Sequence, residues 1–142
     1  MSITSFSKQQ LIPQEEKLEV QRHKSELFIG IPKETSFQER RICLTPDAVN
    51  SLVYHGHRVM IESGAGESSS YSDKEYSDAG AEITKDTKKV YGCPILLKVE
   101  PPTLAEIELM NPQTILISAI QLKTRKSDYF EALHKKKITA LA

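Results

Sequence analysis

Residues 31–46 read IPKETSFQERRICLTP and combine the end of an apolar strand, a polar loop and the start of a helix. An apolar run, residues 27–31, precedes the loop, and Thr45 followed by Pro46 is typical of an N-cap and a first helical position. Two adjacent arginines lie in the loop. An arginine held where a strand gives way to a helix is well placed to bind a small anion, because a guanidinium is always charged and can donate two parallel hydrogen bonds to a carboxylate.

From this stretch onward, strand and helix signals alternate along the chain. The predicted strands are residues 27–31, 58–62, 81–84, 95–99, 114–118 and 138–141, and the predicted helices are residues 46–54, 72–80, 86–91, 104–110 and 127–136. Repeated βα units of this length imply a parallel sheet. We therefore predict an α/β fold, a Rossmann-like (flavodoxin-like) doubly wound, mainly parallel sheet with helices on both faces. Because the chain stops at Ala142, directly after an apolar strand, we expect a fragment of a longer polypeptide.

The composition argues against several classes of function. The 142 residues correspond to about one domain, and nineteen basic and nineteen acidic side chains give a formal net charge of zero. A neutral chain lacks the positive excess with which proteins bind nucleic acid or anionic lipid. No apolar run approaches the roughly 20 residues of a membrane helix, and the polar N-terminus lacks the apolar stretch of a signal peptide. We expect a cytoplasmic protein with no nucleic-acid or membrane partner.

Residues 1–26 differ from the rest of the chain. They are rich in charged helix formers and offer few apolar contacts, which is typical of an exposed helix or a solvated tail. We predict an N-terminal helical or disordered extension over residues 1–26 and a folded domain over residues 27–142. Cys43 and Cys93 have neither CxxC nor CxxH spacing, so they indicate no disulfide framework and no metal site.

Three polar residues follow predicted strands and are candidates for a binding site. Arg41 follows the first strand, Lys98 terminates the apolar run Ile-Leu-Leu, and Gln121 follows the fifth strand. Open parallel sheets bind ligands at the carboxyl ends of their strands, so we expect these three side chains to converge on one crevice. A surface salt bridge is the competing interpretation of Arg41, and an end-of-strand pair with Glu100 is that of Lys98.

The sequence Gly64-Ala65-Gly66 invites a dinucleotide-binding interpretation, because glycine turns after strands let backbone N–H groups approach phosphate. The third glycine of the motif is missing, since Ser69 stands in its place. We therefore favour a plain turn over a phosphate-binding loop. None of the four histidines has the setting of a general base.

Several segments together resemble a known family. IGIPKE, RICLTPDAV, GHRVMIESGAG, YSDKEYSDAGAEI and LLKVEPP resemble, in unbroken order, the N-terminal domain shared by alanine dehydrogenase and the alpha subunit of proton-translocating nicotinamide nucleotide transhydrogenase. In alanine dehydrogenases the arginine of the R-V-A-L-T-P motif and the lysine of the M-K-V-K-E-P motif bind the substrate. The resemblance implies substrate binding by Arg41 and Lys98, with Lys98 and Gln121 as catalytic residues.

Gln121 departs from the family pattern, because a histidine that binds substrate and exchanges a proton is usual at this place. Glutamine can hydrogen-bond a carbonyl oxygen but cannot exchange a proton near neutral pH. The resemblance implies an NAD-dependent alanine dehydrogenase that interconverts L-alanine with pyruvate and ammonia, with NAD bound mainly by a domain beyond Ala142. It also implies a homo-oligomer, and a 142-residue chain that is inactive alone.

Two other functions remain open. The transhydrogenase alpha subunit has similar motifs and no amino-acid substrate, which would account for Gln121, although its usual FIWPAQN-type segment is absent here. A non-catalytic module that binds a small oxo acid is the third possibility. The sequence alone favours alanine dehydrogenase.

Overall fold

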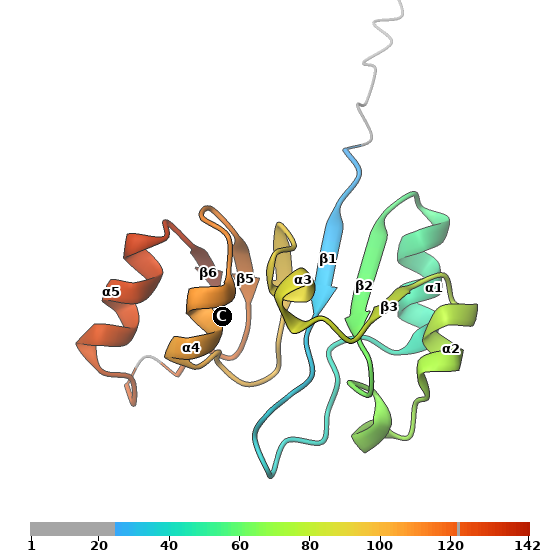
Figure 1. The fold of residues 1–142 in the computed structure, drawn as a ribbon, viewed down its shortest axis with the longest axis horizontal. Helices are drawn as coiled ribbons and strands as arrows, with labels where there is room; N and C mark the ends of the chain where they lie inside the picture. Colours follow the sequence, from blue (N-terminus) through green and yellow to red (C-terminus); the bar gives the residue numbers. More distant parts are fainter. Residues whose placement is uncertain (1–24, 122) are drawn as a thin grey trace, which may run out of the picture.

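The computed structural model, drawn in Figure 1, describes residues 25–121 and 123–142. The predicted extension over residues 1–26 lies almost entirely outside the described residues.

The alternation of strands and helices is confirmed. The strands are β1 (Phe28–Ile31), β2 (Arg58–Glu62), β3 (Glu82–Thr84), β4 (Ile95–Leu97), β5 (Ile115–Ile117) and β6 (Thr139–Leu141). The helices are α1 (Pro46–Tyr54), α2 (Asp73–Asp78), α3 (Thr87–Tyr91), α4 (Leu104–Leu109) and α5 (Ser127–Lys135). A 3-10 turn, η2 (Glu67–Ser69), was not predicted. Every predicted strand and helix is present, with its ends displaced by two residues at most.

The six strands form one parallel sheet in the order β3-β2-β1-β4-β5-β6. The Rossmann-like fold is therefore confirmed. The prediction named two doubly wound forms, and the strand order is that of the Rossmann form rather than the 2-1-3-4-5 order of flavodoxin. The direction of winding reverses between β1 and β4, and the loops after these two strands leave the sheet side by side.

Helices cover both faces of the sheet, and two apolar clusters hold them there (Figure 1). On one face Ile29 and Ile31 pack with Val49 of α1 and Tyr76 of α2. The opposite cluster gathers α3, α4 and α5 over the middle of the sheet, and its buried members are Tyr91, Cys93, Leu96, Ile107, Met110, Leu116, Tyr129 and Leu133. The two-residue period of the strands divides the apolar residues between these faces.

Close packing of α3 requires the glycine in β1. A Cβ atom added to Gly30 would lie 2.6 Å from the carbonyl oxygen of Val90 and 2.9 Å from Cδ2 of Leu96. Real Cβ atoms do not approach that closely, so only glycine lets the end of α3 lie against the strand. This contact places Tyr91, the last residue of α3, over the carboxyl end of the sheet.

One half of one face is open in the described part of the chain. α1 and α2 pack on β2 and β3, whereas Ile115, Ile117 and Leu141 on the other half are 37%, 42% and 50% exposed. A cavity of about 450 Å³ lies along this half, lined by Leu97, Ile117 and Leu141 among others. Exposed apolar surfaces of this kind often mark interaction sites in proteins.

Two neighbouring residues of β5 test this arrangement. Leu116 is fully buried beneath the α3–α5 layer and Ile115 points to the open half. Leu116→Ala should lower the free energy of unfolding by about 2–5 kcal/mol, as for other large-to-small core substitutions. Ile115→Ala should lower it by less than half as much, because the side chain is already partly hydrated. Urea denaturation of both variants measures the difference, and equal losses would contradict an open face.

Candidate functional site

Lys98 is the first residue after β4, at the carboxyl end of the sheet. Its side chain is only 1% exposed, and its Nζ lies 3.3 Å from Glu34 Oε2 and 3.3 Å from Glu106 Oε1. A third contact, 3.4 Å long, joins Nζ to the hydroxyl of Tyr91. The sequence interpretation that paired this lysine with Glu100 is wrong for the described residues, because its acidic partners come from other elements.

Four separate elements supply this network. Glu34 lies in the loop after β1, and its Oε1 also accepts a 2.7 Å hydrogen bond from the backbone N–H of Val99. Glu106 belongs to α4, where its Oε2 accepts from the N–H of Thr103 in a capping box. Burial alone would raise the pKa of Glu106, but the Thr103 N–H and the Lys98 charge outweigh it and lower this pKa. Burial raises the pKa of Tyr91, so its hydroxyl stays protonated.

Arg41 lies on the loop between β1 and α1 and is largely exposed. Its Nε and NH2 donate hydrogen bonds of 2.8 and 2.6 Å to the two carboxylate oxygens of Glu39, and its backbone N–H donates a third. These bonds lower the pKa of Glu39 to about 2, so the carboxylate remains ionised at neutral pH. The salt bridge considered from the sequence is therefore present. It occupies one edge of the guanidinium and leaves NH1 without a protein partner among the described residues.

Gln121 is exposed and lies beyond the carboxyl end of β5. Its side-chain Oε1 accepts a 3.2 Å hydrogen bond from the hydroxyl of Thr124, and its backbone oxygen accepts from the same hydroxyl. The carboxamide is thus held within a turn, with its NH2 group left to donate.

The three predicted residues follow β1, β4 and β5, which are neighbours in the sheet. Cys43 connects two of them in space: burial raises the pKa of its thiol to about 11, and the charges of Lys98 and Arg41 both act on it. Cys43 and Lys98 also line the same cavity. No direct contact joins Arg41 to Lys98 in the described residues, and their convergence on one substrate stays a prediction.

The sequence analysis missed the acidic residues that hold the two cations. Each of these residues, which are Glu34, Glu39 and Glu106, pairs with Arg41 or Lys98. Only Glu106 had a recognisable signal in the sequence. The pattern Thr103-x-x-Glu106 before an apolar turn is typical of a capping box. That pattern predicts the start of a helix but says nothing about a lysine eight residues upstream.

The turn over residues 64–66 uses its glycines internally. The N–H of Gly64 donates to Asp73 Oδ1, and a Cβ atom on Gly66 would lie 2.6 Å from the Tyr76 ring. The carboxylate of Glu67 lies against Gly64 as well. Lys33 Nζ, the ion-pair partner of Glu67, lies at Gly64 too, so the glycines of this turn pack against side chains of the protein itself. The plain turn favoured by the sequence matches this geometry.

Residues 25–121 and 123–142, which the structure describes, lack two features. None of their helices is long and apolar enough to cross a membrane. They contain no group of three or more His, Cys, Asp or Glu side chains placed to hold a metal ion.

Comparison with known proteins identifies the fold family. Residues 30–142 match the family model described as the N-terminal domain of alanine dehydrogenase/PNT. The chain belongs to this family. Alanine dehydrogenase of Bacillus subtilis (strain 168) is 36% identical over 116 residues, which are 82% of this chain and 30% of that protein.

Solved structures of the family superpose well on the chain. An L-alanine dehydrogenase has a TM-score of 0.78 at 34% identity, covering 82% of this chain and 32% of that one. A transhydrogenase from Sinorhizobium meliloti has a TM-score of 0.75 at 26% identity, covering 81% of this chain and 34% of that one. The chain thus spans about a third of the length of the alanine dehydrogenases that it matches.

The Lys98 network should make a large contribution to the stability of this family domain. Lys98→Met keeps the length of the side chain but leaves Glu34 and Glu106 buried without a cation, so the free energy of unfolding should fall by about 3–5 kcal/mol. Adding Glu34→Gln and Glu106→Gln should recover much of this loss, because neutral amides do not need the cation. Chemical denaturation of the single and triple variants measures both effects. A single variant as stable as the parent would show that Lys98 is not paired as described.

Proposed function

We propose that this chain is the substrate-binding part of an NAD-dependent alanine dehydrogenase, which converts L-alanine, NAD and water to pyruvate, ammonia and NADH. The family and the names of its relatives support the oxidoreductase class. The observation that carries the proposal is Arg41, whose guanidinium is fixed at the carboxyl edge of the sheet with one edge still able to donate. In this proposal the substrate domain comprises residues 27–142, residues 1–26 are an extension, and the enzyme is cytoplasmic.

Arg41 binds the substrate carboxylate in the proposed site. Glu39 holds Nε and one hydrogen of NH2, so the carboxylate approaches the NH1 edge. A guanidinium has five N–H donors in a fixed fork, which is enough to serve both carboxylates at once. Glu39 thereby orients Arg41 without consuming its capacity to bind.

Lys98 binds the reacting end of the substrate by exchange. Among the described residues, the Lys98 ammonium donates to Glu106 and Tyr91 and forms an ion pair with Glu34 without a hydrogen bond, and its side chain is only 1% exposed. A substrate oxygen therefore has to replace one of these acceptors. Once bound, the ammonium polarises the carbonyl, and the NH2 group of Gln121 hydrogen-bonds the same end of the molecule without exchanging a proton.

NAD accepts the hydride in the proposed reaction. The glycine turn of this chain lacks the third glycine of a dinucleotide motif, so the proposal assigns NAD to a part of the enzyme outside the described residues. The residues described here bind and orient the small acid only.

A transhydrogenase function is the second candidate, and a specific residue favours it. Gln121 cannot exchange the proton that oxidation of an amino acid requires. The fold of the transhydrogenase is nearly as similar to this chain as that of alanine dehydrogenase, with TM-scores of 0.75 and 0.78. A chain with this function needs no site for an oxo acid. Binding of pyruvate therefore discriminates between alanine dehydrogenase and transhydrogenase. A non-catalytic oxo-acid module would also bind pyruvate, but it would lack a dehydrogenase partner domain.

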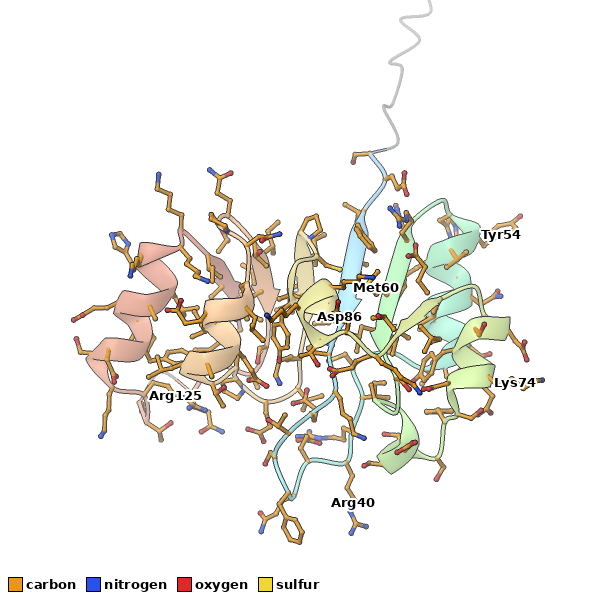
Figure 2. The ribbon with its side chains drawn as sticks, in the orientation of Figure 1. Arg40, Tyr54, Met60, Lys74, Asp86 and Arg125 are labelled. Carbon is orange, nitrogen blue, oxygen red and sulfur yellow. The ribbon has the colours of Figure 1, made fainter. Side chains whose placement is uncertain are left out.

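Pyruvate titrated into the 142-residue chain and followed by NMR should perturb the amides around Arg41 and Val99. Arg41→Ala should weaken binding by about 1.5–3 kcal/mol, the usual worth of a hydrogen bond to a charged group. Arg40→Ala is the matched control, because Arg40 has the same charge but lies at the tip of the loop, pointing away from the sheet (Figure 2). Equal losses in the two variants would mean a non-specific charge effect, and absence of pyruvate binding would favour the transhydrogenase candidate.

We also propose that the chain self-associates through the open half of its sheet. Ile115, Ile117 and Leu141 form an exposed apolar surface next to the edge strand β6, and such surfaces drive association. Sedimentation velocity should show an oligomer that Ile117→Lys dissociates. A parent chain that remains monomeric at high concentration would contradict this proposal.

A further inference from the structure

A second cavity lies at the start of α5, apart from the Lys98 network. Its volume is about 480 Å³, and its polar lining comes mainly from Thr124, Arg125, Lys126 and Tyr129. Figure 2 shows Arg125 at the end of α5 that faces the carboxyl edge of the sheet. Its lining includes none of the three residues of the proposed substrate site.

The electrostatics of the cavity favour an anion. Arg125 and Lys126 are consecutive cations, and Asp128 is the one acidic side chain of the lining. The nine-residue helix α5 begins there with Lys126 at the N-cap position, and the Lys126 side chain makes no capping hydrogen bond. The N–H of Tyr129 already donates to Asp128 Oδ1, so the positive end of the helix dipole and the N–H groups that precede Tyr129 add to the two cations.

Two polar atoms beside this helix start are buried without a partner in the described part of the chain. They are the hydroxyl of Tyr129, whose residue is 4% exposed, and Nε of Arg125. Buried donors are nearly always hydrogen-bonded in folded proteins, so we expect both atoms to donate to an acceptor. Burial raises the pKa of Tyr129, the Arg125 charge lowers it and the Glu106 charge raises it, so the hydroxyl remains a donor.

The two side chains also fix each other. The guanidinium carbon of Arg125 lies 5.2 Å from the centroid of the Tyr129 ring, within the range of a cation–π contact. Tyr129 is anchored in turn by an edge-to-face contact with Phe130. The donors are therefore held in place before any ligand arrives, which lowers the entropic cost of binding.

We propose that this cavity is a binding site for a phosphate-type oxyanion, either inorganic phosphate or the phosphate group of a nucleotide. Arg125, Lys126 and Tyr129 line the cavity beside the first N–H groups of α5, and this number of donors suits the several oxygens of a phosphate. Asp128 lowers the affinity, but its Oδ1 already accepts the backbone N–H of Tyr129.

The site adjoins the turn that holds Gln121. The hydroxyl of Thr124, which lines the cavity, donates to both oxygens of Gln121. An anion bound at α5 therefore lies next to the turn that carries Gln121 in the proposed substrate site. Neither site needs the other in order to bind its ligand.

Inorganic phosphate is the probe for the experiment, titrated into the 142-residue chain at constant ionic strength and followed by ¹H–¹⁵N NMR. The amides of residues 124–129 should shift. Arg125→Gln should weaken binding about tenfold, as expected for loss of a charge-assisted hydrogen bond. Tyr129→Phe should weaken it about threefold to fivefold, because it removes only the hydroxyl and keeps the buried ring.

Lys135→Gln is the matched control, since it removes the same charge from the opposite end of α5 and should leave the affinity unchanged. Adenosine 5′-monophosphate, titrated in parallel, identifies the source of the anion: tighter binding than phosphate indicates a nucleotide, and equal or weaker binding indicates the free ion. Absence of shifts with both probes, or equal weakening by Arg125→Gln and Lys135→Gln, would overturn the proposal. A Tyr129→Phe chain that binds phosphate as tightly as the parent would also overturn it.

Discussion

The burial of Lys98 between two glutamates is the interaction on which the functional edge of this domain depends. An isolated ammonium cannot be removed from water at reasonable cost, so its position at the end of β4 requires acidic partners from elsewhere. Glu34 comes from the loop after β1 and Glu106 from α4, and Tyr91 completes the shell from α3. One charge therefore fixes the relative positions of four elements at the point where the winding of the sheet reverses.

The same network explains how the neighbouring loop is held. Glu34 bridges Lys98 and the backbone N–H of Val99, so the segment after β1 is tied to the segment after β4. The loop that carries Arg41 leaves from this tied segment, and Glu39 then fixes the guanidinium itself. A buried lysine after the adjacent strand thus anchors the start of the loop that carries the exposed arginine.

The fold could be read from the sequence because each of its signals is local. Thr45 with Pro46 begins α1, Gly80 ends the region of α2, and the run from Ile95 to Leu97 forms β4, as the sequence analysis predicted. The site could be predicted only in part, since the position of Lys98 after a strand is local but its partners are not. Glu34 is 64 residues from Lys98 in the chain, and no sequence spacing predicts a contact over that separation. Glu39 lies two residues from Arg41, yet a loop has no periodicity from which such a contact could be inferred.

Both cations of the proposed substrate site are already paired with carboxylates, Arg41 with one and Lys98 with two, and the two arrangements constrain a substrate differently. Glu39 has a pKa of about 2, so protonation does not release it from Arg41 near neutral pH, and a substrate has to share the guanidinium through its other edge. The Lys98 ammonium is buried against Glu34, Glu106 and Tyr91, so a substrate oxygen has to displace one of these groups to reach it. Binding at Arg41 is thus an addition and binding at Lys98 an exchange.

In the proposed enzyme the arginine consequently provides most of the affinity for the carboxylate. The lysine contributes most strongly where negative charge develops on the reacting oxygen, because only a fully charged oxygen competes well with the glutamates that it replaces.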